Sequence, residues 1–525
     1  MIPNTIAEML VSSAAVYGDS LAIAEPDGAR MSFREVDDAA RVAARAFIQA
    51  GAAKGDRVAI WAPNSVAWII AATGLQMAGA ILVPLNTRFK AAEAVGTLTR
   101  VRPVLILTAG AFLDIDYAGL LFAELGEGAG GTLVGLPSVR QIVLLDDVAR
   151  SGTVRWSVFC AERADEAALT DRMKTVGPED TGDILFTSGT TGVPKGAMHG
   201  QAQNLWMADI WNRNNDLRPT DRQIVVNPFF HSFGYRSGFI SGLLAGMATW
   251  PIAIFDPVMV MALIERERIT VLMGPPTLFF AILDHPRRSE FDLSSLRVAH
   301  TGGAKSPAEV VMRLRDELGF SLVLTSFGMT ETTAMVTSNT PHSDLAAITT
   351  TVGRPVPGVE VRIDAQTGAD SGEILVRGPN VMQGYFEDPD ATRAVIDSDG
   401  WLHTGDVGRF DAGGNLCVVD RIKDIVIVGG FNAYPAEIEA VLSAHPAIAE
   451  IAIVAVPDHR QGEVCGAAVV LREGHRLSLD ELVGWSRERM ANFKVPRHLV
   501  VMNALPRTAL GKPQKFLLRG EFWLK

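Results

Sequence analysis

The chain has 525 residues and a formal net charge of −11 at pH 7. This length excludes a single small binding module, and the negative charge argues against general binding to nucleic acid or to an anionic membrane. The three cysteines, Cys160, Cys417 and Cys465, lack metal-ligand spacing, and an odd number makes a poor disulfide framework. The first ten residues lack the basic region of a secretory signal. We therefore expect a large cytoplasmic protein with reduced thiols.

Two uncharged runs, residues 66–85 and 238–255, raise the question of a membrane span, because the first is about one bilayer in length. Both runs contain glycine and proline. We predict that the first run divides near Gly79 into a buried helix and a buried strand, as in a parallel sheet with helices on both faces. The sequence thus predicts no integral membrane span.

Apolar, β-rich runs alternate with helical stretches up to about residue 360, which predicts an α/β fold. From residue 361 onward, short strands and glycine-rich turns predict a β-subdomain. The charged turn DRIKD, residues 420–424, separates it from a compact α+β unit of about 100 residues. We therefore predict domains 1–422 and 423–525. The predicted strands include 57–61, 104–108, 142–145, 224–226 and 271–273, and the predicted helices include 37–49, 258–268, 307–318, 435–442 and 479–491.

The strongest chemical signal is the segment ILFTSGTTGVPKGAMHG at residues 184–200. Its glycines let successive backbone N–H groups turn toward one anion, its hydroxyls add donors, and its lysine adds a cation. The segment is not a Walker A loop, because glycine rather than serine or threonine follows the lysine. We predict a phosphate-binding loop formed by Thr187, Ser188, Gly189, Thr190, Thr191, Gly192 and Lys195.

This loop resembles the phosphate loop of the adenylate-forming superfamily, which includes acyl-CoA synthetases, luciferases and the adenylation domains of peptide synthetases. Further motifs of that superfamily follow in the same order and cover nearly the whole chain. The resemblance implies a large N-terminal AMP-binding body, made of two α/β halves and a β-subdomain, and a small mobile α+β C-terminal domain. It also implies ATP, Mg²⁺ and coenzyme A as cofactors and a small-molecule carboxylic acid as substrate.

The motif SFGMTE, residues 326–331, resembles the superfamily's adenine-binding segment. The resemblance implies that Phe327 packs on adenine, Thr330 contacts the α-phosphate and Glu331 holds Mg²⁺, which prefers oxygen ligands shared with phosphates. The superfamily often has tyrosine where this chain has Phe327, and phenylalanine keeps the stacking face. Taken alone, the Thr-Glu pair would be an ordinary helix N-cap. The remaining members of the predicted segment are Ser326 and Gly328.

The other motifs assign further residues by the same resemblance. Asp406, in WLHTGD, accepts from the ribose hydroxyls, Arg421 contacts ribose and phosphate, and Lys423 is the hinge. Lys512, in the loop LPRTALGK, contacts the acyl carboxylate and the α-phosphate, where its charge offsets the repulsion between two anions. His231 lines the acyl site, although a lone histidine in an apolar segment is more often a packed core residue. Small residues line the ligand pockets (Gly302, Gly303 and Ala304) and the pantetheine tunnel (Gly429 and Gly430).

The implied reaction has two steps, adenylation of a carboxylate and transfer of the acyl group to a thiol, namely that of coenzyme A. Longer stretches such as NPFFHSFGYRSG resemble bacterial ligases that activate a propanoate side chain on a steroid-derived bicyclic ring. We therefore expect a bulky alicyclic or polycyclic acid, terpenoid acids included, and a role in steroid degradation.

Four alternatives remain open at the level of the sequence. They are a medium- or long-chain fatty acyl-CoA ligase, an acyl-AMP ligase that loads a carrier protein, a peptide-synthetase adenylation domain, and a non-catalytic nucleotide-binding sensor. The sequence also does not decide between a monomer and a homodimer.

Overall fold

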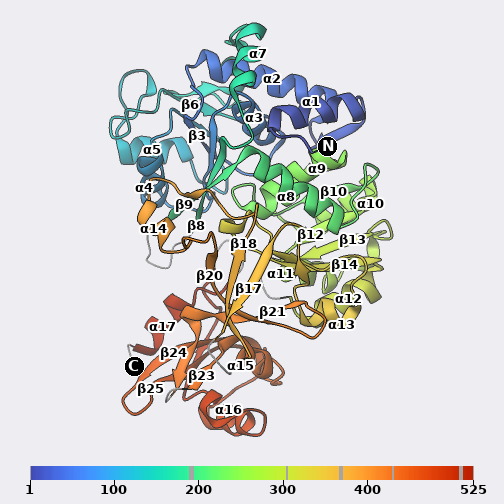
Figure 1. The fold of residues 1–525 in the computed structure, drawn as a ribbon, viewed down its shortest axis with the longest axis vertical. Helices are drawn as coiled ribbons and strands as arrows, with labels where there is room; N and C mark the ends of the chain where they lie inside the picture. Colours follow the sequence, from blue (N-terminus) through green and yellow to red (C-terminus); the bar gives the residue numbers. More distant parts are fainter. Residues whose placement is uncertain are drawn as a thin grey trace. The chain divides into compact units, whose positions relative to one another are not determined.

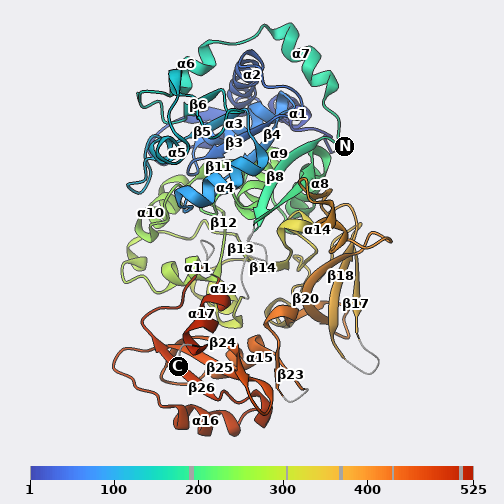
Figure 2. The ribbon, with the colours of Figure 1, turned by 90° about the vertical axis from the view of Figure 1, so that its left-hand side faces the viewer.

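The computed structural model describes six stretches of the chain, which form two compact units (Figures 1 and 2). The described residues are 2–187, 194–302, 306–365, 370–428, 431–507 and 512–523. The first unit comprises Met1–Thr349, Pro355–Val359 and Arg377–Ala394, and the second comprises Thr350–Arg354, Glu360–Val376 and Val395–Lys525.

An eight-stranded sheet forms one half of the first unit, in the order β19-β9-β8-β4-β3-β5-β6-β7. Its strands pair in parallel from β8 to β7, whereas β8–β9 and β9–β19 are antiparallel. The bounds are β3 (Arg57–Trp61), β4 (Ile81–Pro84), β5 (Leu105–Thr108), β6 (Gln141–Leu144), β7 (Val154–Arg155), β8 (Thr181–Thr187), β9 (Lys195–Gly200) and β19 (Gly384–Tyr385).

Helices cover this sheet, and two of them are in very close contact (Figure 2). A Cβ atom on Gly74 would lie 2.6 Å from Ala43 Cβ, so only glycine lets helices α2 and α3 approach this closely. Helix α2 begins at a capping box in which Ser32 and Glu35 satisfy each other's backbone N–H groups. The helices are α1 (Ile6–Tyr17), α2 (Phe33–Gln49), α3 (Val66–Met77), α4 (Ala91–Val101), α5 (Tyr117–Leu125), α6 (Trp156–Ala161), α7 (Glu166–Thr175) and α14 (Pro389–Arg393).

The run 66–85 forms helix α3 and strand β4, with Gly79 at a positive φ of 76° between them. The prediction of a buried helix followed by a buried strand is confirmed, because every residue of α3 except Ala67 is buried. Among the described residues, no helix is long and apolar enough to cross a membrane.

A second, nine-stranded sheet forms the other half of the first unit, in the order β16-β15-β14-β13-β12-β10-β11-β1-β2. Its four-residue strands β11, β12 and β13 are buried at every position, as expected for parallel strands covered on both faces. The strands are β1 (Leu21–Ala24), β2 (Arg30–Ser32), β10 (Arg222–Val225), β11 (Ala248–Pro251), β12 (Val271–Gly274), β13 (Val298–Thr301), β14 (Leu322–Phe327), β15 (Thr337–Ser338) and β16 (Arg354–Pro355). The accompanying helices are α8 (Gln201–Asn214), the π-helix η2 (Phe233–Ile240), α9 (Ser241–Ala245), α10 (Pro257–Glu267), α11 (Pro276–Leu283), α12 (Ala308–Leu318) and α13 (Leu345–Thr350).

The second unit contains two smaller sheets. One has the order β17-β18-β20-β21; the other has the order β23-β22-β25-β24, with β26 beside β25. The first comprises β17 (Glu360–Asp364), β18 (Gly372–Arg377), β20 (Leu402–Phe410) and β21 (Leu416–Arg421). The second comprises β22 (Val426–Val428), β23 (Phe431–Ala433), β24 (Ile448–Asp458), β25 (Gly462–Leu471) and β26 (His498–Met502), with helices α15 (Pro435–Leu442), α16 (Leu479–Arg487) and α17 (Lys515–Trp523).

The fold class is confirmed: the first unit contains two α/β halves, and a β-subdomain precedes a small α+β domain. The predicted helix 479–491 is wrong at its end, because α16 ends at Arg487. The two compact units do not coincide with the predicted domains, because the β-subdomain belongs to the second unit. The predicted boundary between residues 422 and 423 delimits a C-terminal domain that is expected to move, and it stays a prediction.

Candidate active site

The two ends of the predicted phosphate loop lie opposite each other at the end of the β8–β9 hairpin. Thr187 ends β8, Lys195 begins β9, and the two residues are partners in the antiparallel ladder. The ladder therefore fixes where the loop begins and ends. The loop residues Ser188, Gly189, Thr190, Thr191 and Gly192 lie outside the described residues.

The predicted adenine motif lies where strand β14 ends. Ser326 and Phe327 are its last residues, and the short 3₁₀ turn η4 (Thr330–Thr332) follows. A Cβ atom on Gly328 would lie 2.1 Å from the Ala334 carbonyl oxygen, so a larger residue would displace the turn. Glycine is thus required for β14 to lead directly into the turn that carries Thr330 and Glu331.

The Glu331 carboxylate lies near the end of the β8–β9 hairpin, close to a residue from each of its two strands. Glu331 is only 7% exposed. The Tyr385 hydroxyl donates to Glu331 Oε1 at 2.9 Å, and Thr187 Oγ1 lies 3.5 Å from the same oxygen. Lys195 Nζ lies 5.2 Å from the centroid of the Tyr385 ring. The structure therefore brings Thr187, Lys195 and Glu331 together, with Tyr385 between the lysine and the carboxylate.

The donor role of Tyr385 follows from its surroundings. Burial, followed by the charge of Glu331, raises the pKa of Tyr385, so the hydroxyl keeps its proton at neutral pH. The backbone N–H of Met382 also donates to the Glu331 carbonyl oxygen at 2.9 Å. One short segment thus holds both the main chain and the side chain of Glu331.

A buried histidine fixes the Ser326 hydroxyl. Asn215 donates from Nδ2 to the Trp211 carbonyl oxygen, which turns its Oδ1 toward His300 Nδ1 at 2.7 Å. Burial lowers the pKa of His300 to about 3, so the ring is neutral and carries its one proton on Nδ1. His300 Nε2 then accepts from Ser326 Oγ at 2.9 Å.

The predicted acyl-site residues His231 and Gly302 both approach Phe233. The Phe233 backbone N–H donates to His231 Nδ1 at 3.2 Å. A Cβ atom on Gly302 would lie 3.8 Å from the Phe233 ring. The neighbouring residues Gly303 and Ala304 lie outside the described residues.

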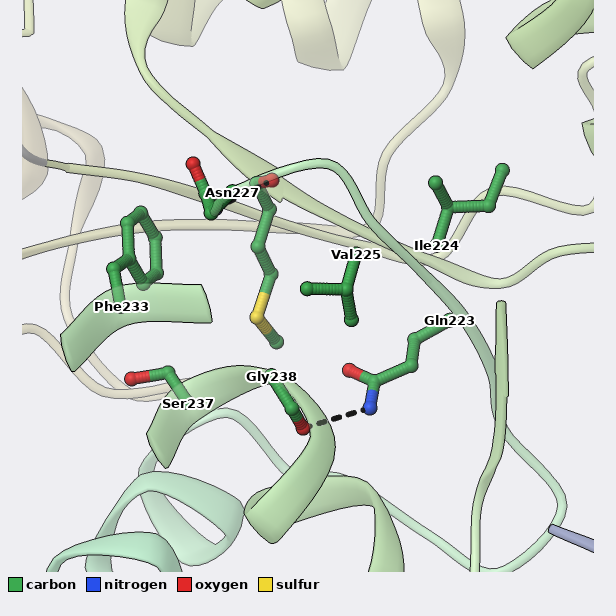
Figure 3. Close-up of a pocket in the computed structure, with 8 residues that line it drawn as sticks. Gln223, Ile224, Val225, Asn227, Phe233, Ser237 and Gly238 are labelled. Carbon is green, nitrogen blue, oxygen red and sulfur yellow. Dashed lines mark hydrogen bonds between the residues drawn. The ribbon is translucent and has the colours of Figure 1, made fainter. Parts of the chain in front are cut away.

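A small cavity with no room for a water molecule lies beside this aromatic residue (Figure 3). Figure 3 shows Phe233 and Ser237 of η2 facing residues of β10, with Gln223 Nε2 donating to the Gly238 carbonyl oxygen at 3.0 Å. The cavity is lined by Gln223, Ile224, Val225, Asn227, Phe233, Ser237, Gly238 and Met273.

The second unit holds the predicted ribose-binding pair. Asp406 and Arg421 are partners in the β20–β21 ladder, and Arg421 Nε donates to Asp406 Oδ1 at 2.8 Å. Burial raises the pKa of Asp406, and the charges of Arg421, Lys512 and Lys423 act against this rise. The structure therefore gathers three predicted cations around one predicted carboxylate.

Lys512 and Lys423 share an electrostatic environment. Desolvation of the ammonium group, followed by the Arg421 charge, lowers the pKa of Lys512, although the residue retains substantial solvent exposure. Burial and then Arg421 also lower the pKa of Lys423. The Lys423 carbonyl oxygen accepts from Arg519 Nη2 of α17 at 2.9 Å. Gly429 and Gly430 lie outside the described residues.

Among the described residues, no group of three or more histidine, cysteine, aspartate or glutamate side chains could hold a metal ion. Within the described ranges, the protein alone therefore does not supply a complete set of such ligands for a metal ion. A single buried carboxylate, Glu331, instead fits Mg²⁺ that takes its other ligands from phosphates and water.

Two family models match the chain. The model of the AMP-binding enzymes matches residues 10–386, and the model of the AMP-binding enzyme C-terminal domain matches residues 437–512. The chain belongs to the AMP-binding enzyme family. The first match spans the phosphate-loop hairpin, Glu331 and Tyr385, and the second ends at Lys512. Asp406, Arg421 and Lys423 lie between the two matches.

Among its relatives in this family are two enzymes named 3-[(3aS,4S,7aS)-7a-methyl-1,5-dioxo-octahydro-1H-inden-4-yl]propanoyl:CoA ligase. The enzyme of Mycobacterium tuberculosis is 45% identical over 93% of this chain and 94% of the relative. The enzyme of Rhodococcus jostii is 44% identical over 99% of both chains. Among solved structures, the o-succinylbenzoate CoA synthetase of Bacillus subtilis, in complex with its acyl-adenylate intermediate, has a TM-score of 0.79 at 27% identity and covers 97% of both chains.

The sequence alone did not reveal several residues that the structure places at or near the candidate active site. Tyr385 lies in the run RGPNVMQGY, residues 377–385, for which the sequence predicts no site role, and His300 had no separate signal. Asp183 did have a signal, because it is the one charged residue of strand β8, TGDILFT, and directly precedes three apolar residues.

Proposed function

We propose that this chain is an AMP-forming carboxylate–CoA ligase that acts on a propanoate attached to a dioxo-octahydroindene ring or on a closely related bulky alicyclic acid. The observation that carries the reaction class is the meeting of Thr187, Lys195 and Glu331 at the end of the phosphate-loop hairpin. Identities of 45% and 44% to two ligases of that acid support the substrate class.

In the first step, a carboxylate oxygen of the acid attacks the α-phosphorus of ATP. The bond from the α-phosphorus to the bridging oxygen breaks, pyrophosphate leaves, and acyl-AMP forms. Lys195, the phosphate loop and the Thr330 hydroxyl bind the phosphates, and the Lys512 ammonium neutralises the attacking carboxylate and the α-phosphate. Preorganised positive charge of this kind is a large source of rate enhancement in phosphoryl chemistry.

Mg²⁺ fits this site through Glu331, a buried carboxylate that already accepts from Tyr385. The ion supplies charge neutralisation for the phosphate oxygens. Tyr385 and Thr187 orient the carboxylate so that it does not rotate when the nucleotide binds.

In the second step, the thiolate of coenzyme A attacks the acyl carbonyl carbon, the bond to the AMP oxygen breaks, and a thioester forms. We assign the pantetheine passage to Gly429 and Gly430 and the change of domain orientation to Lys423. Lys512 is required in the first step only, so the two half-reactions separate the roles of these residues.

The acid binds, in this proposal, beside His231, Gly302 and Phe233.

The test is a panel of acids given to the full chain with ATP, Mg²⁺ and coenzyme A. The panel contains 3-(7a-methyl-1,5-dioxo-octahydro-1H-inden-4-yl)propanoate, a terpenoid acid, octanoate and palmitate, and both pyrophosphate and acyl-CoA are measured. We expect the highest kcat/KM with the indene propanoate. A preference for palmitate would overturn the substrate class, and pyrophosphate release without acyl-CoA would favour an acyl-AMP ligase.

A further inference from the structure

A chain of buried polar side chains runs through the first unit behind the Glu331 turn. Asp183 lies on β8, His199 on β9 and Arg236 on η2, and each is 0% exposed. Asp183 and His199 are partners in the β8–β9 ladder. The proposed function assigns no role to any of the three.

The Asp183 carboxylate is fully paired within this chain. It accepts from Arg236 Nη2 at 2.7 Å and from Asn204 Nδ2 at 2.6 Å, and it faces His199 Nδ1 at 3.0 Å. Arg236 Nε in turn donates to Asn204 Oδ1 at 2.6 Å. Burial opposes ionisation, yet the charge of Arg236 and the hydrogen bond from Asn204 keep the pKa of Asp183 below its usual value. A buried ion pair is weak evidence for stability and can instead specify one geometry.

The other nitrogen of His199 reaches the catalytic turn. His199 Nε2 lies 2.8 Å from the Thr330 carbonyl oxygen, which also accepts from the Thr333 backbone N–H at 3.1 Å. A carbonyl oxygen can only accept, so Nε2 carries the donated proton whether or not the ring is charged. The His199 ring therefore connects the Thr330–Glu331 peptide, on one side, to the Arg236–Asp183 pair on the other.

The turn needs such a support, because η4 is a single 3₁₀ turn of three residues. Short 3₁₀ segments have poor internal hydrogen-bond geometry, so neighbouring groups determine their orientation. The Thr330 side chain and the Glu331 carboxylate project from this turn, and a small rotation of the peptide would move both.

We infer that His199 is a positioning residue for adenylation: its Nε2–H holds the Thr330 carbonyl, and Asp183 with Arg236 anchors its ring. This inference rests on the proposed function, because adenylation supplies its readout. Removing a group that orients a metal ligand typically lowers metal affinity or activity by about 10- to 100-fold, and we expect a loss of the same order for a group that orients the Thr330–Glu331 turn.

Two conservative variants separate positioning from mere structural support. In His199→Gln, the amide nitrogen replaces Nε2 and donates to Thr330, but the contact to Asp183 is lost. In His199→Asn, the amide nitrogen replaces Nδ1 and donates to Asp183, but the contact to Thr330 is lost. We expect His199→Gln to keep pyrophosphate release within about 3-fold of the unchanged protein, and His199→Asn to lose about 10-fold or more in kcat.

Thioester formation from supplied acyl-AMP is measured in the same proteins, at equal folded fraction. We expect it to stay within about 3-fold in both variants, because the second step does not use the α-phosphate contact of Thr330. Full adenylation by His199→Asn, or a parallel loss of both half-reactions, would overturn the positioning role. If His199 only supported the fold through its contact with Asp183, the order of activities would be reversed, and His199→Gln would be the more damaged variant.

Asp183→Asn provides a second test if His199→Asn does not fold. It keeps the volume of the side chain but removes the charge that anchors His199, and we expect adenylation to fall while thioester formation persists. Equal losses in the two steps would count against the inference. The unchanged protein is assayed alongside to separate the two proposals. If it released no pyrophosphate with any acid of the panel, that result would count against the proposed function and not against the inference about His199.

Discussion

Arg421 Nε lies 2.8 Å from Asp406 Oδ1, across the neighbouring strands β20 and β21. The two side chains differ in exposure, since that of Asp406 is 6% exposed and that of Arg421 is 43% exposed. A buried carboxylate fixed by a partly exposed guanidinium cannot rotate freely. It is therefore oriented before any ligand arrives, which is the property that recognition of two adjacent ribose hydroxyls requires.

Replacing Asp406 tests this orientation directly. Asp406→Asn keeps the size of the side chain but removes the charge, and hydrogen bonds to charged groups are worth about 1.5–3 kcal/mol. We expect the KM for ATP to rise about 10-fold or more, with a smaller change in kcat. Asp411→Asn is the matched control, because Asp411 lies in the turn of the same sheet and accepts from Asn415. An unchanged KM in Asp406→Asn would contradict the ribose assignment.

Lys512 is expected to act in the first half-reaction alone. Lys512→Ala should lose acyl-AMP formation but keep thioester formation from supplied acyl-AMP. Because the pKa of Lys512 is lowered, the lysine loses its proton at a lower pH than an ordinary lysine, and adenylation should fall on the alkaline side. Lys512→Arg keeps its charge to far higher pH.

The measurement is the pH profile of pyrophosphate release, in which the alkaline limb of Lys512→Arg should move to higher pH. Lys515→Ala is the control, because this nearby lysine pairs with Glu439 at 2.8 Å and has no proposed contact to ligand. Equal loss of both half-reactions in Lys512→Ala would contradict the division of roles.

Removing one hydroxyl tests the Glu331 site. Tyr385→Phe keeps the ring beneath Lys195 and deletes the donor to Glu331 Oε1. We expect the Mg²⁺ concentration for half-maximal adenylation to rise about 10-fold, because the carboxylate loses a charge-assisted hydrogen bond. Tyr117→Phe loses a comparable buried hydrogen bond, to the Thr87 carbonyl oxygen at 3.0 Å, and should affect stability without changing the Mg²⁺ dependence. The same Mg²⁺ shift in both variants would refute the assignment.

Gly328 is expected to tolerate no side chain. In Gly328→Ala the new Cβ would lie 2.1 Å from the Ala334 carbonyl oxygen, so the turn must move. We expect a fall of several degrees in Tm, as for a loss of about 1–3 kcal/mol, together with a loss of adenylation. Gly96→Ala in helix α4 meets no atom within 4 Å and should be neutral or stabilising by up to about 1 kcal/mol. Thermal unfolding of both variants compares them directly.

The hinge assignment predicts a defect confined to the second step. Lys423→Pro fixes φ at the residue where the chain is expected to pivot, so thioester formation should fall while pyrophosphate release persists. Lys423→Ala removes the same side chain but leaves the backbone free, and it should retain the second step. A normal thioester rate in Lys423→Pro would refute the hinge.

Local pattern was sufficient to predict where many of the helices and strands lie, but not every end. The run 66–85 divides at Gly79 as predicted, and the predicted strand 57–61 matches β3, because buried parallel strands are short apolar runs whose ends carry turn residues. The predicted helix 479–491 extended too far, since the polar residues after Arg487 do not in themselves mark where a helix stops.

Some residues of the candidate site could be predicted from the sequence and others could not. Thr187, Lys195 and Glu331 could be predicted, because each lies within a recognisable motif. Tyr385 and His199 could not, because their roles depend on contacts with Glu331 and Thr330, which lie far away in the sequence. Whether a tyrosine meets a carboxylate is decided by strand pairing, here β19 with β9, and no local spacing encodes it.

The short strand β19 has a further consequence for how the protein is made. Its residue Tyr385 both closes the edge of the eight-stranded sheet and supplies the partner of Glu331. During synthesis from the N-terminus, the hairpin edge beside Lys195 therefore stays unpaired until the ribosome has released residue 385. A nascent chain shorter than this would have an exposed strand edge and no tyrosine partner for Glu331, so the sheet edge is covered and the Glu331 carboxylate is oriented at the same moment, before Lys512 is synthesised.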